Sequence, residues 1–272
     1  MKPAPFDYVR VDTAAEAQAL LAQHGADARI LAGGQSLLAV LTMRLAAPRM
    51  LIDISRVPEL DYVRKEGSML AIGAAVTHAS LQAFPGLDRA LPLVALALPH
   101  VAHIQIRNKG TVCGSLAHAD PSAELPLVTT ALGGEIVLAS QSGRRHVAAG
   151  EFFLGMLQTA CAADEMIVEV RLPLAAAGER HAFREVALRQ GDFALVALAA
   201  VASGRRLSLA VGGVADRPVV RHWEGLEAAD VADTLNDYAW SLDAQDDVHA
   251  TARYRRHLVR TLGGALLNEV RA

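Results

Sequence analysis

The residues with the clearest chemical potential are paired glycines that interrupt an apolar segment near the N-terminus. Residues 31–37 read LAGGQSL, with Gly33 and Gly34 between a strand-like stretch and a helix-like one. Glycines at such a turn let backbone N–H groups approach an anion without a Cβ atom in the way, and a helix N-terminus adds partial positive charge. The arrangement suits a pyrophosphate. It matches neither G-x-G-x-x-G nor G-x-x-x-x-G-K-[ST], and taken alone it is more typical of a plain strand–helix turn than of an anion site.

A second suggestive stretch, residues 105–126, reads QIRNKGTVCGSLAHADPSAELP. Small residues and hydroxyls dominate positions 110–115, which predicts a backbone-rich surface for a polar ligand. Asp120 followed by Pro121 is typical of a helix start, with the proline at the first helical position. On this local view Asp120 is only a helix cap and Glu124 only an acid in the first helical turn.

Metal and thiol chemistry have little support in the sequence. The two cysteines, Cys113 and Cys161, form no Cys-x-x-Cys motif. This excludes a disulfide framework, a structural zinc site and a four-thiolate iron–sulfur cluster within the chain. His100 and His103 have the spacing of a ligand pair, but no third ligand accompanies them. We therefore expect no metal on this chain.

The amino-acid composition limits the classes of protein to which the chain could belong. The 272 residues are 52% hydrophobic and 20% charged, with a net charge of −3, which predicts a folded protein of about two domains and argues against nucleic-acid binding. The longest apolar run, residues 193–202, is too short to span a bilayer. The first residues contain no apolar signal-peptide segment, so a cytoplasmic protein is expected.

Apolar periodicity predicts the elements that must position these segments. Helices are predicted over residues 13–24, with Thr13 as N-cap, and after Leu37 and Thr77. Strands are predicted at residues 28–32, 50–54, 68–74, 135–139 and 165–172. The stretch from 98 to 126 is predicted to be loop-rich.

Composition shifts at residues 173–178 (PLAAAG), which predicts a linker. Beyond it, the runs 181–188, 195–202 and 206–212 are separated by turn residues and predict an antiparallel meander. Helices over residues 228–240 and 249–270 are predicted to close the chain.

Together, LAGGQSLL and IRNKGTVCGSLAHADPSAELP resemble the two flavin-binding motifs of the FAD-carrying medium subunits of molybdenum hydroxylases. That group includes carbon monoxide dehydrogenase, bacterial xanthine dehydrogenase and nicotine dehydrogenase. The resemblance extends through most of the chain. The strand EMIV at 165–168, the turn QGDFALV at 190–196 and a basic terminal helix that starts near Tyr254 follow in the family's order.

The resemblance implies non-covalently bound FAD. Residues 31–37 would wrap its pyrophosphate, and residues 111–115 would line its other side. The side chains of His118, Asp120 and Glu124 would lie near the ribityl chain and pyrophosphate, where a carboxylate such as that of Glu124 can accept hydrogen bonds from the ribityl hydroxyls. The cofactor-binding residues implied in this way are Leu31, Ala32, Gly33, Gly34, Gln35, Ser36, Leu37, Val101, Ala102, Thr111, Cys113, Gly114, Ser115, His118, Asp120, Glu124, Ile167, Arg184 and Phe193.

At three of these positions the residue in this chain can be compared with the residue that is usual in the family. Phe193 matches an aromatic position against the isoalloxazine ring, although it could equally be a core aromatic. Arg184 falls where relatives often carry lysine, which keeps the charge but not its geometry. Cys113 stands where the family usually has glycine, and a positive φ there would strain the loop by roughly 1–3 kcal/mol. A redox-active thiol is not supported, because no partner cysteine or activating group is evident.

No catalytic constellation accompanies these motifs, which fits a subunit whose chemistry is the cofactor's. In the family, a large subunit carries the molybdopterin cofactor and a small subunit carries 2Fe–2S clusters. The medium subunit takes electrons from the clusters and passes them to NAD, a quinone or another acceptor. The resemblance therefore implies a heterotrimer that further pairs as a dimer of heterotrimers, with no nucleic acid involved. Substrate and acceptor are left open.

Two other functions are compatible with the residues alone. One is a free-standing flavin-dependent dehydrogenase or oxidase with its own substrate pocket. The other is a nucleotide-binding or assembly module without redox function, suggested by Cys113.

The predicted fold is α+β. An FAD-binding domain of the vanillyl-alcohol oxidase (PCMH) type would span residues 1–175, with a small N-terminal part over about 1–55 and a larger part over about 56–175. A C-terminal domain of the carbon monoxide dehydrogenase flavoprotein type would span 176–272, with a three-stranded antiparallel sheet and helices.

Overall fold

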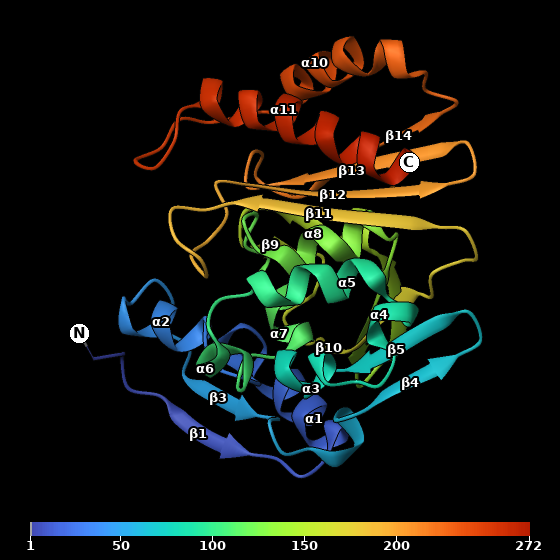
Figure 1. The fold of residues 1–272 in the computed structure, drawn as a ribbon. Helices are drawn as coiled ribbons and strands as arrows, with labels where there is room; N and C mark the ends of the chain where they lie inside the picture. Colours follow the sequence, from blue (N-terminus) through green and yellow to red (C-terminus); the bar gives the residue numbers. More distant parts are fainter. Residues whose placement is uncertain (1) are drawn as a thin grey trace.

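The computed structural model describes residues 2–272, which form three larger sheets and one two-stranded hairpin; in Figure 1 the C-terminal sheet lies above the other two. The first is a small parallel sheet in the order β1-β3-β2, built from β1 (Asp7–Arg10), β2 (Ala28–Leu31) and β3 (Met50–Asp53). Helices α1 (Ala14–His24) and α2 (Leu37–Thr42) and a 3₁₀ turn at Gly25–Asp27 connect its strands. The Thr13 hydroxyl accepts a hydrogen bond from the Glu16 N–H at 3.2 Å, which confirms the predicted N-cap.

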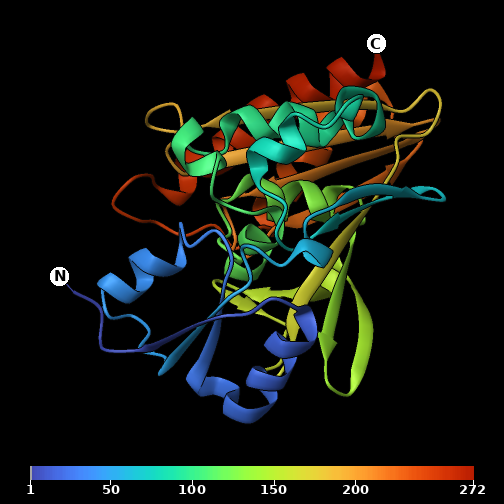
Figure 2. The ribbon, with the colours of Figure 1, turned by 90° about the horizontal axis from the view of Figure 1, so that it is seen from below.

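The middle sheet is antiparallel, in the order β4-β5-β10-β6-β7. Its strands are β4 (Val63–Glu66), β5 (Met69–Gly73), β6 (Glu135–Ser140), β7 (Gly143–Ala148) and β10 (Met166–Pro173). The predicted strands at 68–74, 135–139 and 165–172 are all present. Figure 2 shows the N-terminal sheet in blue beside the long yellow-green strands of this sheet.

Helices and short turns surround this middle sheet. Their bounds are η2 (Pro58–Leu60), α3 (His78–Gln82), α4 (Leu87–Ala90), α5 (Pro92–Ala97), η3 (Leu98–His100), α6 (Ile104–Arg107), α7 (Val112–His118), α8 (Glu124–Ala131) and α9 (Ala149–Phe152). A hairpin of β8 (Phe153–Gly155) and β9 (Gln158–Thr159) follows α9.

The stretch 98–126 is more helical than predicted, since it contains η3, α6, α7 and the start of α8. These helices are too short for apolar periodicity to reveal them. The prediction that Asp120 caps a helix was also wrong. Its carboxylate instead accepts from the Ser122 N–H at 2.9 Å, a local turn that ends before α8 begins at Glu124.

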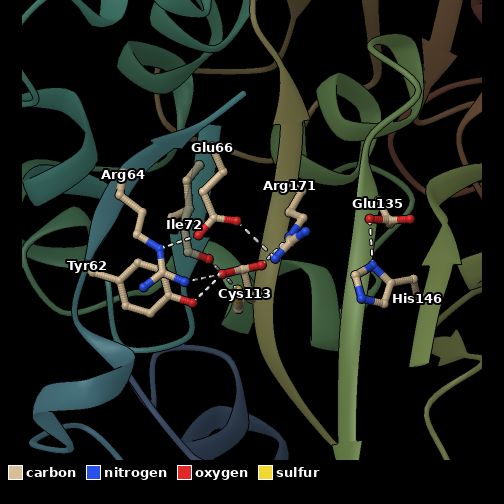
Figure 3. Close-up of polar contacts among 9 residues, drawn as sticks. Tyr62, Arg64, Glu66, Ile72, Cys113, Glu135, His146 and Arg171 are labelled. Carbon is tan, nitrogen blue, oxygen red and sulfur yellow. Dashed lines mark hydrogen bonds and ion pairs between the residues drawn. The ribbon is translucent and has the colours of Figure 1, made fainter. Parts of the chain in front are cut away.

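A polar cluster around one buried acid, Glu169, joins β4 to β10 across β5 (Figure 3). Glu169 on β10 is only 3% exposed, and it accepts hydrogen bonds from the Tyr62 hydroxyl and from Arg171. Glu66 on β4 extends the cluster through Arg171 at 3.1 Å and Arg64 at 2.5 Å. Because both arginines contact both acids, the buried charge of Glu169 is compensated within the sheet.

The C-terminal sheet is an antiparallel meander of β11 (Arg180–Val186), β12 (Val196–Ser203), β13 (Arg206–Gly212) and β14 (Val219–Glu224). The meander was predicted, but with three strands, and β14 was missed. That strand lies at the sheet edge, and its residues (VVRHWE) are all half-buried or exposed, so it carries no continuous apolar run.

Both faces of this sheet are covered. Helices α10 (Val231–Ser241) and α11 (Ala252–Arg271), preceded by η4 (Ala228–Asp230), lie on one face, and α5 and α8 lie on the other (Figure 1). This double cover explains why β12 is apolar along almost its whole length. No helix within residues 2–272 is long and apolar enough to cross a membrane.

Tyr238 on α10 links this helix layer to the sheet. Its ring is fully buried, and its hydroxyl donates to the Val219 carbonyl at 2.8 Å and lies 3.3 Å from the Leu209 carbonyl. We expect Tyr238→Phe to lower the free energy of unfolding by about 1–3 kcal/mol, because a buried acceptor loses its donor. Tyr254→Phe, at an exposed position on α11, should change it by less than about 0.5 kcal/mol. Denaturant unfolding of both variants measures the difference, and equal stabilities would contradict it.

Candidate functional site

A cavity of about 900 Å³ opens where the N-terminal sheet, the α6–α7 segment, β10 and the β11–β12 loop meet. Its volume is in the range of sites that enclose a small molecule or cofactor. Most of the residues predicted from sequence line it. These are Ala32, Gly33, Gly34, Gln35, Ser36, Leu37, Val101, Ala102, Thr111, Cys113, Gly114, Ser115, His118, Glu124, Ile167 and Phe193.

Three predicted residues do not line the cavity. Leu31 ends β2, and an added Cβ at Gly34 would lie 3.2 Å from its side chain, so it supports the turn from behind. Asp120 is engaged in the turn before α8. Arg184 lies outside the lining. Its guanidinium donates to Glu269 at 2.8 Å, on the face of β11 that helix α11 covers.

Gly33 brings the two sequence motifs into backbone contact. A Cβ atom at this position would lie 2.1 Å from the Lys109 carbonyl oxygen and 2.7 Å from the Gly110 Cα atom. Only glycine permits this approach. Gly34 has φ of +71°, a conformation that side chains with a Cβ rarely adopt.

The turn between β2 and α2 presents unused hydrogen-bond donors. None of the backbone N–H groups of residues 33–37 donates a hydrogen bond to a residue in the described part of the chain. Polar groups left in this way need an acceptor from outside the chain or from water. A row of N–H groups beside glycines is the donor set that an anionic ligand such as a pyrophosphate requires.

The α7 segment forms the opposite wall. The Thr111 hydroxyl accepts from the Gly114 N–H at 3.1 Å and so caps α7. Cys113 lies inside this helix without a positive φ, so the strain considered from its sequence context does not arise. Its thiol is buried 3.7 Å from the Ile72 carbonyl oxygen, and burial raises its pKa, which keeps it protonated and unreactive.

A strained corner faces the cavity at Ala102, whose φ is +41°. The Arg107 guanidinium donates to the carbonyls of Val101 and Ala102 at 2.9 and 3.0 Å, and these bonds hold the corner in place. Sequence reasoning missed Arg107, because an arginine in an IQIR segment looks like any surface cation.

His78 is a second missed residue of the cavity wall. Its Nε2 lies 2.9 Å from the Thr111 carbonyl, and its buried Nδ1 has no hydrogen-bond partner among residues 2–272. Burial lowers its pKa to about 4, so the ring is neutral at pH 7 and its Nδ1 can accept a hydrogen bond from a ligand. The sequence signal was only the Thr77 N-cap beside it.

Two buried acids belong to this region. Glu124 begins α8 and lines the cavity, and burial raises its pKa to about 7. Glu185 on β11 was not predicted, and burial raises its pKa to about 8. Over the described residues, no cluster of three or more His, Cys, Asp or Glu side chains could hold a metal ion.

Comparison with known proteins defines the class to which this site belongs. Residues 4–175 match the family described as the FAD binding domain in molybdopterin dehydrogenase. The chain belongs to this family. It is accordingly an FAD-binding subunit of a molybdopterin-dependent oxidoreductase, and the cavity has the size and donors that this cofactor requires.

Particular relatives agree over most of the chain. The 6-hydroxypseudooxynicotine dehydrogenase complex subunit alpha of Paenarthrobacter nicotinovorans is 37% identical over 278 residues, 96% of this chain and 93% of that one. The carbon monoxide dehydrogenase medium chain of Hydrogenophaga pseudoflava is 41% identical over 74% of this chain and 70% of its own.

Solved structures show the same fold. Carbon monoxide dehydrogenase from Hydrogenophaga pseudoflava, in a form that lacks the Mo-pyranopterin moiety, aligns with a TM-score of 0.93 at 34% identity, over 99% of this chain and 98% of that one. Quinoline 2-oxidoreductase from Pseudomonas putida 86 aligns with a TM-score of 0.91 at 33% identity, over 99% and 98% of the two chains. The predicted α+β fold of the PCMH type is confirmed.

The buried acids predict a pH dependence of stability. Because folding raises the pKa of Glu185 from 4.5 to about 8, the folded chain binds its proton more tightly, and this group's stabilisation is lost as pH rises through that window. Relative to the wild type, Glu185→Gln should therefore become progressively more stable between pH 4.5 and about 8. Denaturant titrations at a series of pH values measure the difference.

The matched control is Glu151→Gln, at an exposed position on α9. Its stability relative to the wild type should not vary over the same window. A constant difference for Glu185→Gln as well would show that Glu185 is not buried as described.

Proposed function

We propose that this chain holds FAD non-covalently in the cavity and relays electrons from the 2Fe–2S clusters of a partner subunit to an external acceptor. The row of unused N–H donors at residues 33–37 supports this placement of the cofactor most strongly. The row is held beside Gly110 by a backbone contact that only glycine at position 33 permits. Bound FAD supplies a carrier that accepts electrons singly and releases them in pairs.

The residues of the cavity have separate tasks in this proposal. The N–H groups of residues 33–37 bind the pyrophosphate. The small residues of α7, Gly114 and Ser115, allow close approach of the cofactor from the other wall. Neutral His78 offers an acceptor and Glu124 a carboxyl group for ligand hydroxyls. Val101 and Ile167, both buried, supply apolar contact that excludes water.

Phe193 would cover the ring system at the cavity mouth. Its side chain is 64% exposed although it lines the cavity, so a core role does not explain it. An exposed aromatic beside an open cavity is placed to stack on a planar ligand. Arg184 is not part of the proposed site, because Glu269 holds its guanidinium on the other face of β11.

The proposed partners are a large molybdopterin subunit and a small 2Fe–2S subunit, assembled as a dimer of heterotrimers in the cytoplasm. Relatives named medium chain and medium subunit support a complex of this kind. We also propose a division into an FAD-binding domain at 1–175 and a C-terminal domain at 176–272. It is supported by the change of sheet between β10 and β11.

The alternative function, a nucleotide-binding or assembly module without redox function, was suggested only by Cys113. Cys113 lies in a regular helix with its thiol buried, so its presence does not disturb the α7 wall. The free-standing oxidase would need catalytic side chains of its own. Serine, histidine and aspartate residues line the cavity, but no hydrogen bond among residues 2–272 joins them into a Ser/His/Asp arrangement.

Gly34→Val tests the placement of the pyrophosphate. It should strongly lower the FAD content of the purified complex, because a side chain at φ +71° disturbs the turn that presents the N–H donors. Gly67→Val is the matched control: its φ is +59°, and a Cβ atom there meets nothing within 4 Å. The control bears similar backbone strain far from the cavity and should keep its FAD. Equal FAD content in the two variants would show that the phosphate site is misplaced.

Phe193→Ala tests the aromatic cover. Loss of a stacking contact worth about 0.5–1.5 kcal/mol should raise the FAD dissociation constant roughly 2- to 12-fold. Leu188→Ala, on the same loop and 61% exposed but outside the cavity lining, should leave it unchanged. Flavin fluorescence during dilution of the complex gives both constants. An unchanged constant for Phe193→Ala would remove this residue from the site.

A further inference from the structure

Two acidic side chains are buried where α8 and α5 pack on the C-terminal sheet, and neither pairs with an arginine or lysine among residues 2–272. Glu124 is 7% exposed and lines the cavity from the start of α8. The Glu185 side chain is 3% exposed, and its buried Oε2 has no hydrogen-bond partner within residues 2–272. Burying an unpaired carboxylate is strongly unfavourable, so each group favours its protonated form.

The surroundings of the pair contain few other charges. Among residues 2–272, His100 is the basic group within ion-pair distance of the two acids, with Nδ1 4.0 Å from Glu185 Oε1, and burial lowers the pKa of this ring. His118, at the end of α7, which packs against α8, lines the same cavity as Glu124. Asp120 adds negative charge near Glu124, and Glu124 in turn raises the pKa of Glu185. Helix α5 and strand β12, which pack against β11, contain no titratable residue. Arg184 points to the other face of β11 and pairs with Glu269.

His100 connects the pair to solvent. Its side chain is 41% exposed, and its ring packs against Phe183 with the centroids 5.1 Å apart. This contact fixes the ring with one nitrogen toward Glu185. A histidine between a buried acid and water can carry protons in both directions.

We propose that Glu124 and Glu185 act as a proton reservoir for the flavin, binding one proton through His100 as two electrons reach the cavity and releasing it as they leave. The inference rests on the function proposed above. Iron–sulfur clusters deliver electrons without protons, so reduction adds negative charge to a poorly solvated cavity. Such charge raises the proton affinity of nearby acids.

Two electrons and two protons enter together on reduction and leave together on oxidation. Two electrons from reduced 2Fe–2S clusters and one proton from water convert FAD to FADH⁻. A second proton from water forms an O–H bond on the carboxylate pair and offsets the added charge. When the external acceptor takes the electrons, the O–H bond breaks and the proton returns to solvent. The pKa values of about 7 and 8 for the two acids suit exchange near neutral pH.

The first test is the pH dependence of the flavin midpoint potential in the purified complex, followed by spectroelectrochemistry. Each proton taken up with two electrons steepens the slope by about 30 mV per pH unit, the two-electron equivalent of a tenfold change. Glu185→Gln should lose up to one such increment at and above about pH 8, where this acid is ionised before the electrons arrive. Glu151→Gln, with the same chemical change on the exposed surface of α9, should keep the wild-type slope.

A second measurement can be made on the wild-type complex alone. The reduced-minus-oxidised infrared spectrum of the wild-type complex should show the carbonyl band of a newly protonated carboxylic acid. That band should be missing in Glu185→Gln or Glu124→Gln. His100→Leu should keep the band and the slope but slow proton uptake, seen with an indicator dye after rapid reduction.

The outcomes separate this inference from the proposed function. A flavin-containing wild-type complex without the carboxylic acid band, or with the same slope in Glu185→Gln, overturns the reservoir and leaves the FAD site standing. A complete complex without flavin overturns both.

Discussion

The site depends on the backbone contact between Gly33 and the Lys109–Gly110 peptide. The two motifs lie more than seventy residues apart in the sequence, yet their backbones approach so closely that no other residue fits at Gly33. Gly110 in turn packs beside the His78 ring, and the Gly110 carbonyl accepts from the His78 N–H at 2.9 Å. The N-terminal sheet is thereby fixed to the helices over the middle sheet, and the cavity exists because this junction holds its two walls at a set distance.

The C-terminal sheet and its helices help to form the cavity. The Gly213 N–H, after β13, donates to the Pro121 carbonyl at 2.7 Å, just before α8. Buried Arg255 on α11 donates to the carbonyls of Leu195 and Gly213, at 2.5 and 2.6 Å. Leu195 follows Phe193 by two residues, so the terminal helix anchors the loop that carries the aromatic cover. The buried acids Glu124 and Glu185 lie in this region, where α8 packs on the C-terminal sheet.

The sequence predicted those features that depend on local chemistry. Paired glycines revealed the turn at Gly33 and Gly34, the Thr13 and Thr77 hydroxyls marked helix starts, and apolar runs located the strands of both larger sheets. The family resemblance placed most of the cavity wall. Features that depend on packing could not be seen. Glu185 lies in an ordinary alternating strand, and only the cover by α5 and α8 makes it a buried acid. Arg184, its neighbour, points to the opposite face because successive side chains alternate along a strand, and there it pairs with Glu269.

The complete complex shows whether this chain contributes FAD beside molybdenum and iron–sulfur clusters. The chain is co-expressed with its partner subunits, the absorption spectrum of the purified complex is recorded, and the flavin released by acid is identified. We predict FAD in equimolar amount with this chain, together with iron–sulfur absorbance. A complete complex that contains molybdenum and iron–sulfur clusters but no flavin would contradict the account.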